Sequence, residues 1–405
     1  AIWKGPMSEE FYRIKRLPPY VIAEVNGMRA AARAAGRDII DLGMGNPDLP
    51  PPQHVIDKLC EVAQKPNAHG YSASSGIPGI RKAQANYYAR RFGVDLDPET
   101  EVVMTMGSKE GLSSLATAIT APGDVVLAPN PSYPIHTFGF IIAGATIRSV
   151  PTTPDENYFA SLERAMAFTV PRPSILIVNY PSNPTAETVD LAFYERLVAW
   201  ARENKVWILS DLAYSELYYD GNPTPSILQV PGAKDVAVEF TSMSKTFSMA
   251  GWRVGFAVGN ARLISALKRV KSYLDYGAFT PIQAAACAAL NGPQDIVEAN
   301  RTLYQKRRDV MVEAFGRAGW DIPSPKASMF AWAPLPPALK EMGSLEFSKQ
   351  LLTHAEVAVA PGVGYGEEGE GYVRIAMVEN EQRLRQAARN VKRYLARMGV
   401  NSSAA

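Results

Sequence analysis

A lysine that directly follows a predicted strand is the residue of this chain best placed for amine chemistry. The segment reads VEFTSMSKTFSMAGWRVG, with Lys245 flanked by Ser242 and Ser244 and with Arg253 eight residues further on. A lysine that leaves a sheet into a crevice loses water, and nearby cations lower its pKa further, which favours imine formation. The hydroxyls and Arg253 are suitable donors for a phosphate dianion. For any single lysine, a surface position in a polar loop is the alternative.

Two further polar segments follow apolar stretches that predict buried strands. In VWILSDLAYSELYY, Asp211 comes directly after the strand and Tyr214 follows three residues later. A carboxylate there can pair with a protonated pyridine nitrogen, and the phenol can donate to a phenolate oxygen. For a single aspartate, capping a helix N-terminus is the alternative. In VNYPSNPTA, Asn183 offers an amide donor in a loop stiffened by prolines, where it can also form a turn.

Two more features favour the binding of anions. In TMGSKEGLSSL, Gly107 and Ser108 open a predicted helix, and the free N–H groups of a helix start attract an anion. The segment matches neither GxGxxG nor a P-loop, so it predicts neither dinucleotide nor ATP binding. In GYVRIAM, Arg374 stands among apolar strand residues, where it needs a carboxylate partner. That partner is either a residue of the chain, in a structural ion pair, or a substrate carboxylate held by a bidentate fork.

Alternating strand and helix patterns in the middle of the chain position these segments. Apolar runs predict strands at 101–105, 124–128, 146–150, 174–178, 206–210, 235–241 and 253–258. We therefore expect an α/β large domain, residues 46–285, around a mostly parallel central sheet with ligands at the carboxyl ends of its strands. Residues 286–405 predict a smaller α+β domain. We expect residues 1–45 to pack against it without a partner strand of their own.

Composition argues against several classes of protein. With 405 residues, 20% of them charged, and a net charge of +2, the chain gives no reason to expect nucleic acid or an anionic membrane as partner. The four histidines are scattered, so we expect no metal. Cys60 and Cys287 stand in apolar, helix-like stretches and predict buried reduced thiols of a cytoplasmic protein. No membrane span or secretory signal is recognisable, and Met7 could be the natural start.

The order of these motifs resembles the class I and II aminotransferases of fold type I. The resemblance covers nearly the whole chain, from GMGNPD at 43–48 through GSKEG, SNPT, DLAY, SMSK and AGWRVG to RIAM at 374–377. HGYSASSGIPGIRKA, NPSYPIH, MAGWRVGF and DYGAFTPIQ are similar to the bacterial alanine aminotransferases, near the LL-diaminopimelate aminotransferases. The resemblance implies pyridoxal 5'-phosphate (PLP) as cofactor and a homodimer with shared active sites.

The resemblance also implies three sets of site residues. The catalytic set binds the cofactor as a Schiff base, moves the proton at Cα and supports the ring: Lys245, Asp211 and Tyr214. The cofactor set adds the residues that stack on the ring, bind its O3′ or hold its phosphate: Tyr133, Asn183, Ser108, Lys109, Ser242, Ser244, Arg253 and Tyr71. Of these, Tyr71 would reach the phosphate of the neighbouring subunit. The substrate set contacts the amino acid, with the arginine on the α-carboxylate: Gly45, Asn183 and Arg374.

One absence bears on the substrate. Aspartate-specific relatives place a second arginine shortly before the turn that matches FTP, but no arginine occurs here between Arg269 and Arg301. We therefore expect a ping-pong transfer of the amino group from L-alanine to 2-oxoglutarate. LL-diaminopimelate or another neutral amino acid as substrate, and C–S lyase chemistry with the same lysine, stay open. A PLP-binding transcription regulator is disfavoured, because only 42 residues precede GMGNPD.

Overall fold

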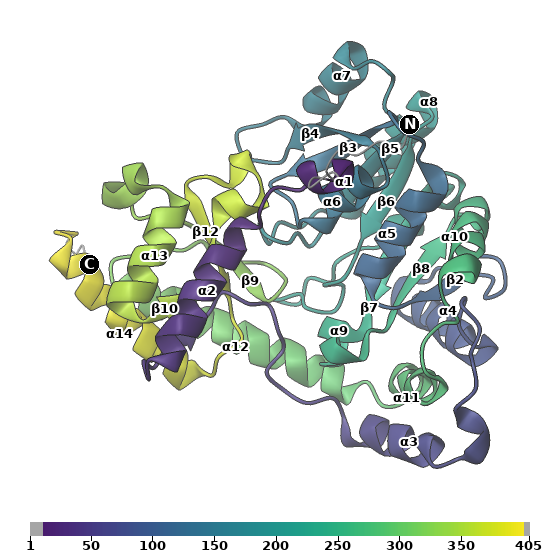
Figure 1. The fold of residues 1–405 in the computed structure, drawn as a ribbon, viewed down its shortest axis with the longest axis horizontal. Helices are drawn as coiled ribbons and strands as arrows, with labels where there is room; N and C mark the ends of the chain where they lie inside the picture. The colour runs from purple at the N-terminus through teal and green to yellow at the C-terminus, as the bar shows by residue number, and fades with distance from the viewer. Residues whose placement is uncertain (1–10, 401–405) are drawn as a thin grey trace, which may run out of the picture.

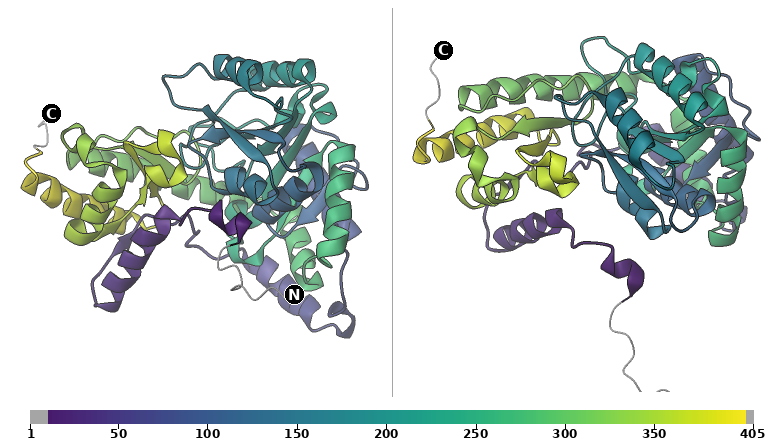
Figure 2. Two further views of the ribbon diagram at one scale, coloured as in Figure 1. Left: turned by 45° about the horizontal axis from the view of Figure 1, so that its top comes forward. Right: turned by 90° about the horizontal axis from the view of Figure 1, so that it is seen from above.

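A computed structural model describes residues 11–400, so Met7 lies outside the described residues. Figures 1 and 2 show two parts, a large body of helices around a twisted sheet and a smaller part built from both ends of the described chain. The long helix α12 (Asp295–Arg317) runs from one part to the other. The chain is thus an α/β protein with a smaller α+β part, as its strand and helix patterns predict.

The large body contains a seven-stranded sheet. In spatial order its strands are β2 (Val102–Thr105), β8 (Gly255–Gly259), β7 (Ala237–Ser242), β6 (Trp207–Asp211), β5 (Ile175–Asn179), β3 (Val125–Asn130) and β4 (Thr146–Pro151). Strand β8 is antiparallel to both of its neighbours, and the other pairings are parallel. Every predicted strand is present, which confirms the mostly parallel sheet.

Helices cover both faces of this sheet, because its strands are apolar on both faces. In β5, Leu176 and Val178 belong to one apolar cluster, whereas Ile175 and Ile177 belong to another, as the two-residue period of a strand requires. The first cluster is completed by α4 (Pro78–Phe92), α7 (Tyr158–Phe168), α8 (Leu191–Asn204) and α11 (Thr280–Asn291). The second is completed by α5 (Ser108–Ile119), α6 (Ile135–Ile142) and α10 (Ala261–Leu274). Helix α3 (Gln53–Ala63) packs on α11.

The smaller part has two short sheets. An antiparallel sheet has the order β11 (Ala360–Pro361), β12 (Tyr372–Ala376), β9 (Phe330–Pro334), and β1 (Ile40–Asp41) pairs in parallel with β10 (Val357–Ala358). The helices of this part are α2 (Val21–Ala34), α13 (Ser344–Ala355) and α14 (Glu381–Arg397). The expectation that the N-terminal segment has no partner strand is wrong, because Ile40 pairs with Val357. Two residues are too few to show the strand periodicity that sequence patterns depend on.

The apolar clusters bear on where the two parts divide. Position 285/286, the predicted boundary, falls inside α11, whose Ala285, Ala286 and Ala289 pack in the cluster of the large sheet. Along α12, Val297 packs in that same cluster, whereas Tyr304 packs in the cluster of the smaller part. We propose that the division lies within α12, a continuous helix that belongs to both parts.

The N-terminal segment bridges the two parts. Near α1 (Tyr12–Lys15), Arg16 donates to the carbonyl of Ala145 in the large body at 3.2 Å, whereas α2 packs on α13 of the smaller part. The residues between them therefore cross from one part to the other (Figure 2). Short 3₁₀ helices occur in other connections: η1 (Pro66–Ala68), η2 (Ile227–Gln229), η3 (Ala233–Asp235), η4 (Ala250–Trp252), η5 (Pro337–Met342), η6 (Gly362–Tyr365) and η7 (Glu367–Gly369).

The surface corrects one expectation about the cysteines. Cys60 is exposed and Cys287 is half-buried, so the expectation of two buried thiols is wrong for Cys60. Helix α3 buries Val55 against α11, and Cys60, five residues on, lies on another face of the helix.

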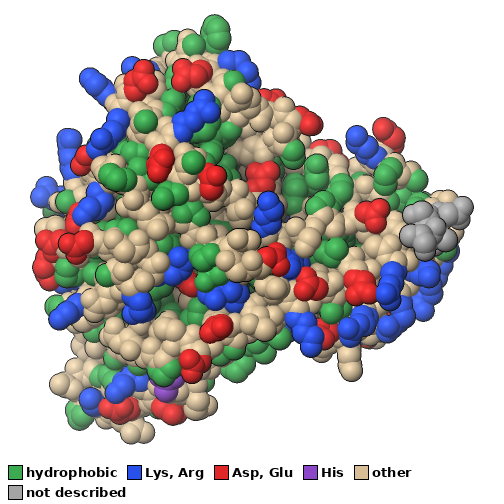
Figure 3. Space-filling view, turned by 180° about the vertical axis from the view of Figure 1, so that it is seen from behind, with side chains coloured by type: hydrophobic (Ala, Val, Ile, Leu, Met, Phe, Trp, Pro, Cys, Tyr) green, Lys and Arg blue, Asp and Glu red, His purple; other side chains and the backbone are tan. Residues whose placement is uncertain are grey.

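Figure 3 shows acidic and basic side chains interspersed over much of one face, with basic ones gathered where α14 lies. In residues 11–400, no helix is long and apolar enough to cross a membrane.

Candidate active site

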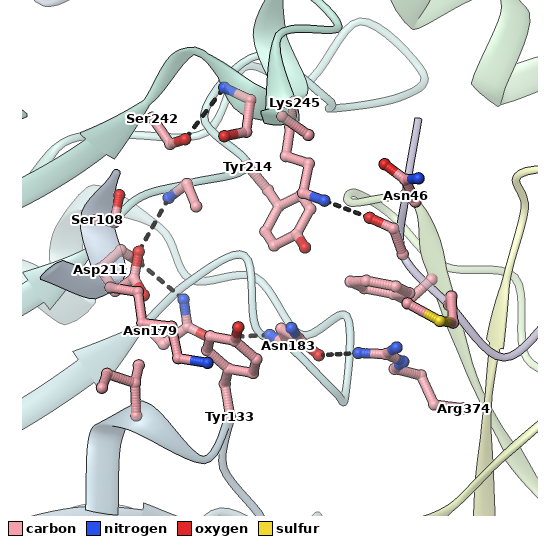
Figure 4. Close-up of a pocket in the computed structure, with 18 of the residues that line it drawn as sticks. Asn46, Ser108, Tyr133, Asn179, Asn183, Asp211, Tyr214, Ser242, Lys245 and Arg374 are labelled. Atoms are coloured by element: carbon pink, nitrogen blue, oxygen red, sulfur yellow. Dashed lines mark hydrogen bonds between the residues drawn. The ribbon is translucent and has the colours of Figure 1, made fainter. Parts of the chain in front are cut away.

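The carboxyl ends of β5, β6 and β7 lead into a cavity of about 400 Å³ that residues of both parts line (Figure 4). All the predicted site residues except Tyr71 line this cavity: Gly45, Ser108, Lys109, Tyr133, Asn183, Asp211, Tyr214, Ser242, Ser244, Lys245, Arg253 and Arg374. They come from segments that are far apart in the sequence. The sheet brings them together because its parallel strands end at one edge.

Lys245 enters the cavity from α9 (Met243–Thr246), the single helical turn that follows β7. Ser242 caps this turn by accepting a hydrogen bond from the backbone N–H of Ser244 at 3.1 Å. The Lys245 ammonium group donates to the carbonyl of Gly45 (Figure 4). Burial, together with the positive charges of Arg374 and Arg253, lowers the pKa of Lys245 to about 8. The alternative of a surface lysine is therefore wrong.

This pKa predicts when the free amine of Lys245 becomes reactive. The ammonium form dominates below about pH 8 and the neutral amine above it, whereas an unperturbed lysine stays protonated to well above pH 9. Competitive labelling with acetic anhydride, carried out on the protein freed of any bound cofactor, should therefore give half-maximal reactivity of Lys245 near pH 8. N-acetyl-lysine amide in the same solution supplies the reference curve. Lys245 reactivity that follows this reference would show that its surroundings do not shift the pKa.

Asp211 ends β6 with both carboxylate oxygens engaged. Its Oδ2 lies 2.8 Å from Nε2 of His136, and its Oδ1 accepts from the backbone N–H of Ala213 at 3.2 Å. Both Asp211 and His136 are buried. No helix begins at this point of the described chain, so the helix-cap alternative is wrong. What the structure shows is a buried carboxylate held in one orientation at the cavity wall.

Arg374 lies in β12 and faces the cavity from the smaller part. Its guanidinium donates to Oδ1 of Asn183 at 2.7 Å and to the carbonyl of Gly43 at 3.0 Å, and it stacks over the ring of Phe330 at 3.9 Å. Nε of Arg374 has no partner, and no ion pair joins this side chain to a carboxylate of residues 11–400. The structural ion-pair alternative is therefore wrong. A buried cation without a counter-ion, in a cavity wall, favours the binding of a carboxylate.

The start of α5 and the segment after β7 form a cradle for an anion. Gly107 caps α5 with φ +83°, and a Cβ atom built on it would lie 2.1 Å from Nη2 of Arg253. The positive φ favours glycine here, and a side chain at this position would displace the guanidinium from its place beside the free N–H groups of the helix start. The hydroxyl of Ser108 donates to the carbonyl of Thr241 at 3.0 Å, which ties the helix start to β7.

Several cavity residues escape the sequence motifs. Tyr20, Phe330 and Tyr365 line the cavity but come from the N-terminal segment and the smaller part, where no motif marks them. Asn46 also lines the cavity and lies within GMGNPD, although its own role was not predicted. His136 supports Asp211, and its position three residues after Tyr133 is a signal that the sequence does carry. Gly45 passes close to Phe330, since a Cβ built there would lie 2.5 Å from the ring.

Tyr71 is the one predicted site residue outside the cavity. Its side chain is 87% exposed and stacks on Tyr276, with ring centroids 4.3 Å apart. Tyr273 and Phe279 are exposed in the same region of the sequence as Tyr276. An exposed aromatic cluster of this kind is typical of a surface that another protein chain covers.

Comparison with known proteins assigns the family. The profile of the family described as aminotransferase class I and II matches residues 37–391, which is most of the chain. The chain belongs to the class I and II aminotransferases. It is thus a PLP-dependent transaminase that acts on amino acids and 2-oxo acids.

Individual relatives cover nearly the whole chain. It is 64% identical over 387 residues to a putative aminotransferase, AatC, of Rhizobium meliloti, with 96% of each chain covered. It is 53% identical to the glutamate–pyruvate aminotransferase AlaC of Escherichia coli, over 94% of this chain and 93% of that one. An LL-diaminopimelate aminotransferase of Moorella thermoacetica is 43% identical over 96% of this chain and 99% of its own length.

Solved structures agree with the fold. Substrate-bound BacF from Bacillus subtilis superposes with a TM-score of 0.89 at 34% identity, covering 96% of this chain and 98% of that one. A double mutant of the aspartate aminotransferase of Thermus thermophilus gives a TM-score of 0.88 at 29% identity, covering 96% of this chain and all of that one. Both results place the chain in fold type I, which confirms the resemblance seen in the sequence motifs.

Proposed function

We propose that this aminotransferase transfers amino groups between the alanine–pyruvate and glutamate–2-oxoglutarate pairs. The observation that carries the proposal is one cavity that holds the amine of Lys245, the carboxylate of Asp211 and the guanidinium of Arg374, which has no counter-ion among the described residues. These are the groups that such a reaction needs for proton transfer, for charge stabilisation and for binding an α-carboxylate.

The residues present fit PLP as cofactor. The cradle of Gly107, Ser108 and Arg253 suits a phosphate dianion, because it combines the free N–H groups of a helix start with a guanidinium, and Gly107 lets the two lie side by side. Asp211 would hold a proton on the pyridine nitrogen, and Lys245 would bind the aldehyde carbon. The bound cofactor supplies an electron sink for the carbanion formed at Cα of the amino acid.

The residues of the chain perform the remaining chemistry. Lys245 would take the proton from Cα of the amino acid and return it to the former aldehyde carbon of the cofactor. Its pKa of about 8 leaves about a tenth of the amine neutral at pH 7, far more than for an unperturbed lysine. Burial raises the pKa of Tyr214, so its phenol stays protonated and would donate a hydrogen bond to O3′ of the cofactor. Arg374 and Asn183, joined at 2.7 Å, orient the α-carboxylate of the substrate.

The choice of substrate pair rests on two observations. The E. coli relative at 53% identity is named for glutamate and pyruvate, whereas the LL-diaminopimelate aminotransferases in the comparison share at most 43%. The aspartate-type second arginine is missing between Arg269 and Arg301. Without that arginine, another cation has to bind the distal carboxylate of glutamate. Lys109 lines the cavity with its Nζ 5.8 Å from the ring centroid of Tyr133, and we propose that its side chain pairs with this carboxylate. Its backbone N–H would help to hold the phosphate.

We also propose a homodimer. The exposed Tyr71–Tyr276 stack would lie against the second copy, where Tyr71 would reach the phosphate of the partner's cofactor. Aromatic side chains are enriched in such interfaces. In this arrangement each site is complete only when two copies meet.

Replacing Arg374 by glutamine should weaken the binding of the substrate carboxylate. One charge-assisted contact contributes about 1.5–3 kcal/mol, so kcat/KM for L-alanine should fall roughly 10- to 150-fold. The matched control is Arg385→Gln, which removes the same charge from the exposed side of α14. Steady-state kinetics that show equal effects of both substitutions would contradict the assignment of Arg374.

Steady-state kinetics test the proposed function. L-Alanine with 2-oxoglutarate should give pyruvate and glutamate, with parallel double-reciprocal lines that indicate a ping-pong mechanism. The same assay with LL-diaminopimelate as donor tests the alternative substrate. If LL-diaminopimelate gave a higher kcat/KM than L-alanine and L-glutamate, the proposed pair would be wrong. Pyruvate and ammonia released from a sulfur amino acid without any acceptor would instead indicate lyase chemistry.

A further inference from the structure

Lys271 of α10 is a buried lysine that the proposed function does not use. Its side chain is 1% exposed, and its ammonium group contacts the carboxylates of Glu110 and, at 3.1 Å, Asp275. Removing an ammonium group from water is costly unless partners compensate its charge. One cation therefore joins two acidic residues that lie more than 160 positions apart in the chain.

Glu110 lies in the first turn of α5, directly after Ser108 and Lys109 of the cavity wall. A carboxylate there interacts favourably with the helix dipole but repels a phosphate bound at the same helix start. Its Oε1 pairs with Lys271, whereas its buried Oε2 has no partner among residues 11–400. Burial raises the pKa of Glu110, and the nearby Lys271 opposes this rise. The charge of Glu110 thus depends on Lys271 for its compensation.

Asp275 links Lys271 to the segment that carries Tyr276. Its Oδ1 accepts from the backbone N–H of Gly277 at 2.7 Å. Gly277 has φ +78°, and a Cβ built on it would lie 2.2 Å from the carbonyl oxygen of Ala73, two residues after Tyr71. The packing of Gly277 on Ala73 and the ring stack of Tyr276 on Tyr71 hold the two segments together. The contacts of Lys271 therefore run from the phosphate cradle to the exposed aromatic stack.

We propose that Lys271 is a positioning residue of the cofactor site. It neutralises Glu110, so that the start of α5 accepts a phosphate dianion, and through Asp275 it fixes the Tyr71 segment relative to that helix. This inference rests on the proposed function, because it assumes that the phosphate of PLP lies at the start of α5. A purely structural ion pair would affect stability without distinguishing ligands that carry a phosphate from ligands that do not.

The test compares the binding of PLP and of pyridoxal, which lacks the phosphate, to the full-length protein after removal of its cofactor. Lys271→Met should raise the Kd for PLP about tenfold or more, because a carboxylate without this counter-ion then lies in the first turn of the helix that would hold the phosphate, and should change the Kd for pyridoxal less than about twofold. Adding Glu110→Gln to Lys271→Met should restore PLP binding to within about threefold of the unmodified protein. Arg269→Met, an equal loss of charge on the exposed side of α10, is the control.

Other outcomes overturn the inference or the proposed function separately. Equal weakening of both ligands by Lys271→Met would show a structural role only, and unchanged PLP binding would show no role. If the unmodified protein bound PLP no better than pyridoxal, the phosphate cradle itself would be wrong. If Lys271→Met does not fold, the variant Glu110→Gln by itself tests the inference. The inference then requires that this variant lower the Kd for PLP by about threefold or more and leave the Kd for pyridoxal unchanged. Weaker binding of PLP to Glu110→Gln would contradict it.

Discussion

Lys245→Ala is expected to lower kcat for the alanine–2-oxoglutarate reaction by at least about 10⁴-fold. General acid–base catalysis by one positioned side chain contributes roughly 10²–10⁴-fold, and Lys245 is also the residue proposed to bind the cofactor covalently. The described residues offer no second lysine at the same place in the cavity, since Lys109 lies beside Tyr133 rather than at Gly45. Stopped-flow measurement of the half-reaction with L-alanine separates this loss from any change in product release.

Two controls separate chemistry from folding. Lys392→Ala, on the exposed side of α14, should leave kcat unchanged. A small amine such as methylamine, added to Lys245→Ala, should restore part of the rate in proportion to its concentration, because it supplies the missing base in the vacated space. A Lys245→Ala protein that keeps more than about one hundredth of the original kcat would contradict the role of Lys245 as the acid–base group.

Asp211→Asn is expected to have the second largest effect, a loss in kcat of about 10³-fold. A buried carboxylate next to a protonated ring nitrogen stabilises that proton by about 4 kcal/mol at an effective dielectric constant of about 20, and asparagine removes the charge while keeping the shape. His136, hydrogen-bonded to Oδ2 at 2.8 Å, fixes the carboxylate so that little reorganisation is needed. The measurement is single-turnover kinetics with L-alanine at saturating cofactor.

Asp57→Asn, at an exposed position on α3, is the matched control and should leave the rate unchanged. Asp211→Glu keeps the charge but moves it, so its rate should fall between those of Asp211→Asn and the unmodified protein. A rate for Asp211→Asn within about twofold of the original, with cofactor bound, would mean that Asp211 is no more than a structural partner of His136.

The predictable part of this fold was its central sheet. Strands such as β5 and β6 are apolar on both faces and end in polar residues, so pattern and position together predict a ligand site at their ends. Asp211, Asn183 and Lys245 follow three such strands, and the cavity unites them. Local sequence carries this part of the site, because each residue is placed by the strand directly before it.

The unpredicted part depends on contacts between distant segments. Tyr20 and Phe330 reach the cavity only because the N-terminal segment and β9 pack around Arg374, and nothing within their own segments indicates that packing. Strand β1 is two residues long and exists through its pairing with Val357 and Ala358. The sequence also left open whether Arg374 forms a structural ion pair or binds a substrate. Only the folded chain shows that no carboxylate of the described residues reaches it.

An absorption spectrum of the purified protein, recorded before and after substrate, tests the central claim most directly. We predict a visible band of the cofactor bound to Lys245, its loss on addition of L-alanine, and its return on addition of 2-oxoglutarate. That cycle requires a transaminase with this substrate pair. A band that L-alanine leaves unchanged, while another amino acid removes it, would contradict the proposed substrate. No visible band, even after addition of PLP, would contradict the assignment of Lys245.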